Sequence, residues 1–254
     1  MPFEFNLEEL AHDLKLCRCQ ASYGTDKGYI HSYLANFYQP LLESRNYIFS
    51  ILEIGIFKGS SLVLWNKALP NTLLAGVDIE DQLGLNPEFK LLRADHKFSL
   101  RYGDAYSGDD IFTGLEKFDL IIDDGPHTFK SQLHAIEFRR ILNPKGILII
   151  EDVPNLHYRL GRIKNSIPKQ ERKFLFGIGY VHLSGRYDDA LIIYSRDPDF
   201  KVWFRENSTW ISRNVLLQSY FMASLPPIRS FFRLISISKR RKFHNSKRLI
   251  PDLI

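Results

Sequence analysis

The stretch Lys117-Phe-Asp-Leu-Ile-Ile-Asp-Asp-Gly-Pro-His127, followed by Asn143-Pro-Lys-Gly-Ile-Leu-Ile-Ile-Glu-Asp152, decides the fold class of this chain. The apolar runs 120–122 and 147–150 each end in acidic residues, and residues 128–141 between them have a helical pattern. Short apolar runs separated by a helical segment are typical of buried parallel strands joined by a crossover helix. The pattern therefore predicts an open α/β sheet.

Acidic residues and one histidine follow the ends of these two strands. Ligands of open α/β sheets bind outside the carboxyl ends of the strands, so we expect the side chains at both ends to share one crevice. Carboxylates beside an imidazole suit a hard metal ion with an adjacent base. A lone histidine at a helix start would be interpreted as a capping or solvated residue, but these acidic neighbours favour a functional role. The candidates are Asp123, Asp124, His127, Glu151 and Asp152.

A second motif, Leu52-Glu53-Ile-Gly55-Ile-Phe-Lys-Gly59, links an expected strand over residues 47–54 to a helix that continues to residue 69. Its glycines permit a tight turn and the close approach of a ligand to the backbone. The next expected strand, residues 72–77, ends in Asp78, at the spacing from Gly55 where a carboxylate meets a ribose diol. The motif is not the dinucleotide Gly-x-Gly-x-x-Gly, but with Asp78 it favours nucleoside binding.

The remaining segments complete the fold prediction. A short strand over residues 98–102 ends at Asp104, which is either a solvated turn residue or a third acid at a strand end. We expect helices over 6–18 and 29–42, an irregular connection over 80–97, a variable basic segment after Pro154, and an antiparallel hairpin of residues 174–183 and 190–195. The predicted fold class is α/β: a doubly wound, mostly parallel sheet with a C-terminal antiparallel hairpin, N-terminal helices and a basic helical tail.

The polar loop of residues 22–28 contains two glycines and lies between the two expected N-terminal helices. It is either an ordinary connector or a lid over the site.

Composition limits the class of protein. The chain has 254 residues, of which 44% are hydrophobic, enough for one large α/β domain with appendages. It has two cysteines, Cys17 and Cys19, so we expect no disulfide framework and a reducing, cytoplasmic location. The N-terminal residues do not resemble a signal peptide, and no apolar run has the roughly 20 residues of a membrane span.

Positive charge is concentrated in the tail of the chain. The net charge is +5, but residues 226–254 contain eight lysines and arginines against one aspartate, so the other residues have a net charge of −2. Ile228, Phe231, Phe232 and Ile235 have helical spacing ahead of a basic run at 239–242. Such a helix docks on its own domain or on a second subunit, or it binds a lipid surface or nucleic acid.

Together, the glycine turn, the acids at successive strand ends and the late hairpin resemble the class I S-adenosylmethionine-dependent methyltransferases over roughly residues 47–196. The resemblance implies that the glycine turn lies against the methionine part of the cofactor, that Asp78 binds the ribose and that Asp104 lies near the adenine. It implies a cofactor-binding methyltransferase domain at 47–198, a helical cap or lid at 1–46 and an extension at 199–254. The implied cofactor residues are Lys27, Glu53, Gly55, Gly59, Asp78, Asp104 and Asp123.

A narrower resemblance is to the macrocin- and mycinamicin-type sugar O-methyltransferases and their cephalosporin-hydroxylase-like kin. It depends on Tyr23-Gly-Thr-Asp-Lys27-Gly with His31 and Tyr38, on the glycine-turn motif, and on the Asp-Asp-Gly-Pro-His run with a following Glu-Asp pair. The resemblance implies a magnesium ion held by Asp124, Glu151 and Asp152, with His127 as the general base.

The sequence thus predicts a magnesium-assisted O-methyltransferase that acts on a sugar hydroxyl of a glycosylated metabolite or a polysaccharide precursor. Its expected partners are a small-molecule or glycan acceptor, with a homo-oligomer and peripheral membrane contact through residues 228–248 left open. The alternative is a protein of the same fold that acts on nucleic acid or is attached without catalysis through its tail. The acid-Pro-Pro-aromatic motif of base-amino methyltransferases is absent from the sequence, which disfavours nucleic acid.

Overall fold

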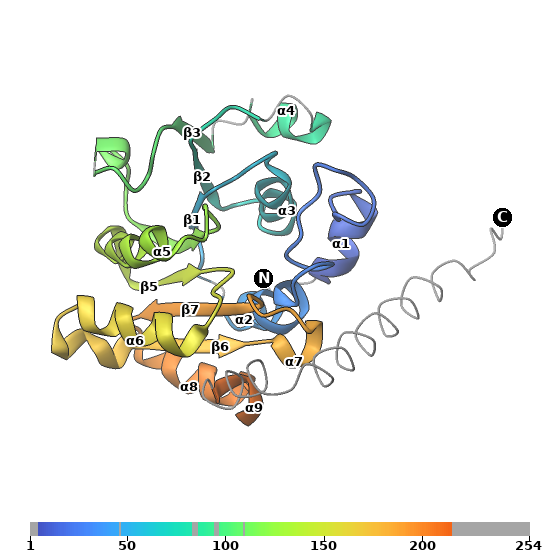
Figure 1. Cartoon of the computed structure of the whole chain (residues 1–254). Coiled ribbons are helices and arrows are strands. Elements are labelled where there is room, and N and C mark those ends of the chain that lie inside the picture. Colours follow the sequence, from blue (N-terminus) through green and yellow to red (C-terminus); the bar gives the residue numbers. More distant parts are fainter. Residues whose placement is uncertain (1–4, 46, 83–85, 94–96, 109, 215–254) are drawn as a thin grey trace.

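The computed structural model describes residues 5–45, 47–82, 86–93, 97–108 and 110–214. Within them the chain forms a seven-stranded sheet with the order β3-β2-β1-β4-β5-β7-β6 (Figure 1). The strands are β1 (Ser50–Ile54), β2 (Leu73–Asp78), β3 (Phe98–Tyr102), β4 (Phe118–Asp123), β5 (Leu142–Ile150), β6 (Leu175–Gly179) and β7 (Ala190–Ser195).

The first five strands are parallel, and β7 pairs antiparallel with both β5 and β6. The chain moves outward from β1 to β3 and then returns to β4 on the other side of β1, so the strand order reverses between β1 and β4. A crevice at the carboxyl ends of the strands is expected at this reversal point. The doubly wound, mostly parallel sheet and the late antiparallel hairpin confirm the predicted fold class.

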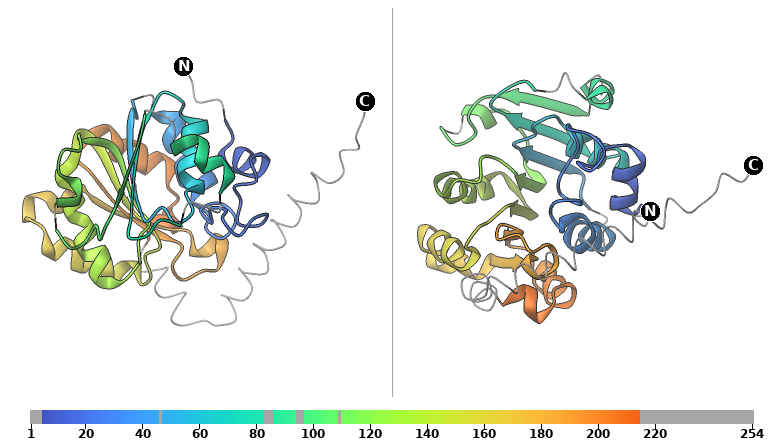
Figure 2. Two further views of the ribbon diagram at one scale, coloured as in Figure 1. Left: turned by 90° about the horizontal axis from the view of Figure 1, so that it is seen from above. Right: turned by 45° about the vertical axis from the view of Figure 1, so that its right-hand side comes forward.

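Helices cover both faces of the sheet (Figure 2). Alternate strand residues point to opposite faces, so Ile51 and Leu120 join one apolar core while Leu52 and Ile121 join the other. The first core includes side chains of α1 (Leu7–Asp13), α2 (Gln39–Ser44), α3 (Ser60–Ala68), α4 (Pro87–Arg93) and α8 (Pro198–Asn207). The second includes side chains of α5 (Phe129–Ala135), a 3-10 turn (Ile136–Ile141) and α6 (Leu156–Ser166).

The N-terminal segment packs into the first core instead of standing apart from the sheet. The Asn6 side chain caps α1 by accepting hydrogen bonds from the backbone N–H groups of Glu8 and Glu9, both at 3.1 Å. The expected helix over 29–42 begins later, as a π-helical turn (Leu34–Tyr38) that continues into α2. Cys17 and Cys19 form a local disulfide, which the low cysteine count does not predict.

Two segments are more regular than the sequence predicts. The connection 80–97 contains α4, which begins at Pro87, a residue whose fixed φ suits the first helical turn. The basic segment after Pro154 contains α6, whose Leu156, Leu160 and Ile163 are buried at helical spacing while its basic residues lie between them. The first strand of the hairpin is shorter than predicted, because a helical turn, α7 (Val181–Ser184), follows β6.

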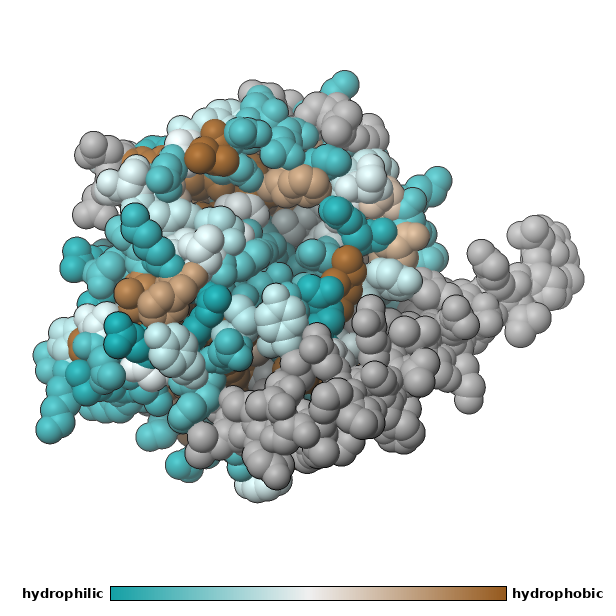
Figure 3. Space-filling view, in the orientation of Figure 1, coloured by the Kyte–Doolittle hydropathy of each residue, from teal (hydrophilic) through white to brown (hydrophobic). Residues whose placement is uncertain are grey.

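The face seen in Figure 3 is mostly hydrophilic, with small apolar patches separated by polar side chains. Among the described residues, every helix is too short or too polar to cross a bilayer. The predicted basic amphipathic helix at residues 228–248 lies outside the described residues. A last short helix, α9 (Trp210–Arg213), precedes that tail.

Because both faces of the sheet are buried, the same substitution should cost more stability at a buried strand position than at an exposed one. Leu148→Ala in β5 removes a fully buried side chain and should lower the free energy of unfolding by about 3 kcal/mol. Leu73→Ala in β2 makes the same chemical change at a side chain that is 49% exposed, and it should cost less than about 1 kcal/mol. Urea denaturation measures both values, and equal losses would contradict the described core.

Candidate functional site

Backbone hydrogen bonds hold the ends of the central strands in register beyond the strands themselves. The N–H of Gly55, after β1, donates to the carbonyl of Val77 at 2.8 Å. The N–H of Asp124, after β4, donates to the carbonyl of Ile54 at 2.8 Å, and that of Glu151, after β5, donates to the carbonyl of Asp123 at 3.0 Å. Residues from three strands are therefore fixed side by side at the reversal point.

The glycine turn after β1 needs the freedom of glycine. Gly55 and Gly59 have φ angles of +81° and +76°, in the left-handed region. A Cβ atom on Gly55 would lie 2.2 Å from the backbone oxygen of Asp124, and one on Gly59 would lie 2.1 Å from the Phe89 ring. The turn is tied to β2, because the Phe57 N–H donates to the Asp78 carboxylate at 2.8 Å.

A cavity of about 570 Å³ opens between the ends of β1, β2, β3 and β4. Gly55, Asp78 and Asp104, which the sequence places in the cofactor site, all line it. The Asp104 carboxylate accepts a hydrogen bond from the Tyr106 N–H at 2.8 Å, which fixes the loop after β3. Other lining residues include Ile54, Phe57, Val77, Ile79, Gly103, Ala105, Tyr106, Asp124, Gly125 and His134.

A smaller cavity of about 240 Å³ lies between the glycine turn and the N-terminal loop. Gly55, Phe57 and Asp124 line both cavities, so the two adjoin at the glycine turn. The smaller cavity is more polar, and its walls include His127 together with Arg18, Thr25, Asp26, Lys58 and Ser61.

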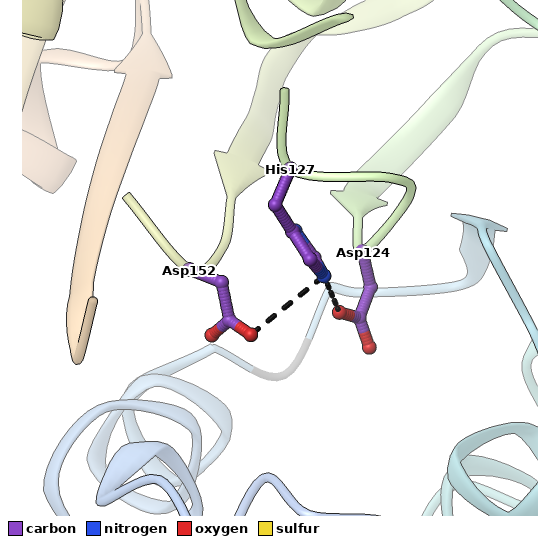
Figure 4. A group of neighbouring side chains, drawn as sticks. All are labelled: Asp124, His127 and Asp152. Atoms are coloured by element: carbon purple, nitrogen blue, oxygen red, sulfur yellow. Dashed lines mark ion pairs between the residues drawn. The ribbon is translucent and has the colours of Figure 1, made fainter. Parts of the chain in front are cut away.

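Asp124, His127 and Asp152 converge beside the smaller cavity (Figure 4). His127 Nε2 lies 3.5 Å from Asp124 Oδ1 and 3.7 Å from Asp152 Oδ2, and one ligand atom from each residue lies within 4.8 Å of the others. His127 and Asp152 have φ angles of +53° and +51°. Because β5 ends at Ile150 and Asp152 is left-handed, its carboxylate turns toward Asp124 instead of alternating away from it.

Glu151 points in another direction. Its two carboxylate oxygens accept short hydrogen bonds from Lys27 Nζ and from the Tyr38 hydroxyl. Lys27 Nζ also lies 2.6 Å from Asp124 Oδ2 and 3.3 Å from Glu53 Oε1, with only 1% of its side chain exposed. Burial lowers the pKa of Lys27, but the three carboxylates outweigh it and hold that pKa well above its ordinary value. The resemblance-based role of Glu151 as a metal ligand stays a prediction.

Asp152 is held by the N-terminal segment as well. The Tyr33 hydroxyl donates to Asp152 Oδ1 at 2.9 Å, and His31 Nε2 lies 3.3 Å from Asp152 Oδ2. Burial lowers the pKa of His31, but the neighbouring carboxylates of Asp189 and Asp152 raise it to about 9. At neutral pH His31 is therefore a cation between two carboxylates.

Three residues predicted to bind cofactor lie behind the cavities. Lys27 Nζ donates to the Asp124 carboxylate. The Glu53 carboxylate accepts a hydrogen bond from the Trp65 indole N–H at 3.2 Å. Asp123 accepts a short hydrogen bond from the Tyr106 hydroxyl. Burial raises the pKa of Asp123 to about 7, although that hydrogen bond opposes the rise.

Two further polar side chains support the loops that carry the site. Gln132 Nε2 donates to the backbone oxygens of Glu151 at 2.9 Å and Asp152 at 3.0 Å. Arg159 donates to the backbone oxygen of His127 at 2.9 Å and to the Gln132 side chain. Sequence reasoning missed both, together with Tyr33 and Tyr106, because they lie on helices or loops without a recognisable motif.

No family model matches the chain. A curated relative, the 8-demethyl-8-alpha-L-rhamnosyl tetracenomycin-C 2'-O-methyltransferase of Streptomyces olivaceus, is 30% identical over 146 residues. The match covers 54% of this chain and 37% of the relative, so the chain spans well under half of the length of that relative.

Solved structures show the same fold. A candidate O-methyltransferase from Klebsiella pneumoniae superposes with a TM-score of 0.50 at 16% identity, covering 78% of this chain and 92% of that one. The MycE methyltransferase of the mycinamycin biosynthetic pathway, solved with Mg and SAH, has a TM-score of 0.47 at 20% identity, covering 88% of this chain and 56% of that one. The curated relative and the shared fold confirm the resemblance to class I S-adenosylmethionine-dependent O-methyltransferases.

The glycine turn gives a prediction with an internal control. Gly55→Ala forces a left-handed alanine and a clash with the Asp124 backbone, whereas Gly114→Ala forces a left-handed alanine with open space around it. Gly114→Ala should cost about 1 kcal/mol of unfolding free energy, the ordinary strain of that conformation. Gly55→Ala should cost at least about 2 kcal/mol more, because the backbone after β4 must move. Equal losses in urea denaturation would show that the described contact is absent.

Proposed function

We propose that this protein is an S-adenosylmethionine-dependent O-methyltransferase that acts, with the help of a magnesium ion, on a hydroxyl group of a sugar. The observation that carries the proposal is the convergence of Asp124, His127 and Asp152 beside two cavities that meet at a glycine turn. The curated relative, which by its name methylates a rhamnosyl 2'-hydroxyl, supports the substrate class. The nucleic-acid and non-catalytic alternatives depend on residues 228–248 and are not favoured.

The two adjoining cavities fit the parts of the cofactor. We place the adenosine in the larger cavity, where Asp78 and Asp104 offer carboxylate acceptors to ribose hydroxyls and to the adenine edge. We place the amino-acid part in the smaller cavity, where Arg18 and Lys58 match its carboxylate and Asp26 matches its ammonium group. The cofactor supplies an electrophilic methyl group, so the protein must chiefly orient and deprotonate the acceptor.

The donor set beside the cavities fits a divalent ion. Asp124 and Asp152 present carboxylate oxygens, the ligands that Mg²⁺ prefers, at a place that is partly open to solvent. A bound Mg²⁺ lowers the pKa of a hydroxyl that it contacts. Since Mg²⁺ prefers oxygen over nitrogen, His127 remains free for proton transfer.

His127 is the proposed general base. Its side chain is 34% exposed and lines the smaller cavity, so an acceptor hydroxyl can reach Nε2. Nε2 lies 3.5 Å from Asp124 Oδ1 and 3.7 Å from Asp152 Oδ2, so the imidazole faces the same point as the proposed metal ligands. Arg159 holds the His127 carbonyl and so fixes the loop from which the imidazole projects.

The first experiment is calorimetric titration with S-adenosylhomocysteine, with Mg²⁺ and again with excess EDTA. Binding in both conditions would support the cofactor, and a mass-spectrometric search for methylated glycosides with S-adenosylmethionine and Mg²⁺ would follow. Transfer to a glycoside that EDTA abolishes is the expected result. Folded protein that binds no cofactor in either condition would overturn the proposal.

Asp78 provides a test of the cofactor placement. Asp78→Ala removes the proposed ribose acceptor and should weaken S-adenosylhomocysteine binding at least about tenfold, as the loss of a hydrogen bond to a charged group does. Glu80→Ala removes an exposed acid two residues away, outside the lining of the cavity, and should leave the affinity unchanged. If Asp78→Ala binds S-adenosylhomocysteine with unchanged affinity, the proposed place of the adenosine in the larger cavity is wrong.

His127 provides a test of the base. His127→Ala should lower the turnover number roughly 10²- to 10⁴-fold while cofactor affinity stays near that of the unaltered protein. His157→Ala, at an exposed position on α6, is the matched control and should leave turnover unaffected. Full activity of the His127→Ala variant would show that His127 is not the general base.

A further inference from the structure

Cys17 and Cys19 close a very short disulfide loop beside the smaller cavity. The bridge spans a sequence separation of 2, so Arg18 is the single residue that it encloses. A disulfide stabilises a fold more when it closes a longer loop, so this one contributes little to the stability of the whole domain. Its effect is therefore local, on the backbone of Arg18. Both cysteine residues are partly exposed, so a thiol reagent can reach the disulfide loop.

The polar loop that follows holds the backbone on either side of the disulfide. The Arg18 N–H donates to the Thr25 carbonyl at 2.9 Å, and the Thr25 N–H donates to the Leu16 carbonyl at 2.6 Å. Gly24 packs so closely that a Cβ atom there would lie 2.4 Å from the carbonyl carbon of Cys17. The disulfide loop and the polar loop are thus packed as one unit, so a change in one is felt by the other.

Arg18 reaches from this unit to the wall of the smaller cavity. Its guanidinium carbon lies 5.4 Å from the centre of the Phe57 ring, and Lys58 Nζ lies 4.8 Å from the same centre. Two cations therefore meet at this ring, and both line the cavity where the proposed function places the carboxylate of the cofactor. The position of Arg18 thus affects how well that carboxylate is bound.

We propose that Cys17 and Cys19 form a reversible thiol–disulfide modification site that controls how tightly the cofactor binds. This inference rests on the cofactor placement in the proposed function. With the disulfide closed, the backbone of Arg18 is fixed and its guanidinium is presented to the carboxylate in advance. With the disulfide open, Arg18 has to be ordered when the cofactor binds, so the affinity falls.

The modification is an exchange with a dithiol reductant. One thiolate of the dithiol attacks a cysteine sulfur, the S–S bond breaks, and the other cysteine leaves as a thiolate that takes up a proton. The second thiolate of the reductant then resolves the mixed disulfide, which leaves two cysteine thiols and a reductant oxidised by two electrons. Glutathione disulfide reverses the change and is itself reduced to two molecules of glutathione. Disulfides in reducing compartments are usually of this transient kind.

The test compares the two forms of the full chain. The sequence contains two cysteines, so a response to reductant must begin at this pair. The protein is treated with glutathione disulfide or with dithiothreitol, its free thiols are counted by alkylation and mass spectrometry, and S-adenosylhomocysteine binding is measured by calorimetry. The dithiol form should bind roughly tenfold more weakly, since a backbone position and a long side chain must be ordered. Equal affinities, or two free thiols after oxidation, would overturn the inference.

Three variants separate this role from a general effect on folding. Cys19→Ser cannot form the disulfide, so it should bind as weakly as the reduced protein and should not respond to reductant. Arg18→Gln should bind weakly in both forms, because the disulfide acts through that guanidinium. Arg162→Gln removes an exposed arginine outside the lining of the cavity and should keep the full response. An Arg18→Gln variant that still responds tenfold to reductant would overturn the inference.

Hydrogen exchange tests the disulfide loop without the cofactor. The amides of Arg18 and Thr25 are hydrogen-bonded beside the disulfide, and they should exchange at least about tenfold faster after reduction. Equal exchange rates in the two forms would overturn the inference. If neither form binds S-adenosylhomocysteine, the cofactor placement in the proposed function is wrong, and the exchange rates still decide whether the disulfide fixes this loop.

Discussion

The buried contact between Lys27 and the carboxylates of Glu53, Asp124 and Glu151 is the constraint on which the architecture of the site depends. Two of these acids, Glu53 and Glu151, are at most 1% exposed, and burying a carboxylate without a partner is costly. The partner comes from a loop about 100 residues away in sequence from Asp124. The N-terminal segment therefore supplies the positive charge at the carboxyl ends of the central strands. Whether the loop 22–28 is a connector or a lid stays a prediction.

Parallel-sheet register explains why so few residues suffice to build the site. The backbone amides of Gly55, Asp124 and Glu151 continue the pairing of neighbouring strands by one further hydrogen bond each. This extension places the glycine turn against the acid after β4, and that acid beside the acids after β5. The chemistry then depends on which way each side chain turns, and hydrogen bonds from Tyr33, Tyr38 and Lys27 determine that direction.

Much of the fold could be predicted, because buried strands leave strong local signals. The apolar runs that end at Asp78, Asp123 and Glu151 gave the strands of the parallel sheet, and β3 begins and ends where the sequence predicts. Helix α6 was missed because its basic residues hide an apolar stripe of three side chains. Of the five residues expected in one crevice, Asp124, His127 and Asp152 lie together. Glu151 and Asp123 instead accept hydrogen bonds behind it. The position of Lys27 could not be predicted from spacing, since its contacts join segments far apart in the chain.

The backbone conformation of His127 and Asp152 lowers the stability of the fold. Both residues are left-handed, a conformation that costs a residue with a side chain on the order of 1 kcal/mol and costs glycine almost nothing. A sequence selected for stability alone would thus place glycine at both positions. The protein instead keeps an imidazole and a carboxylate there, and under the proposed function this loss of stability directs the base and a metal ligand at one point. If the proposed roles hold, a glycine substitution at either residue would raise thermal stability and lower activity.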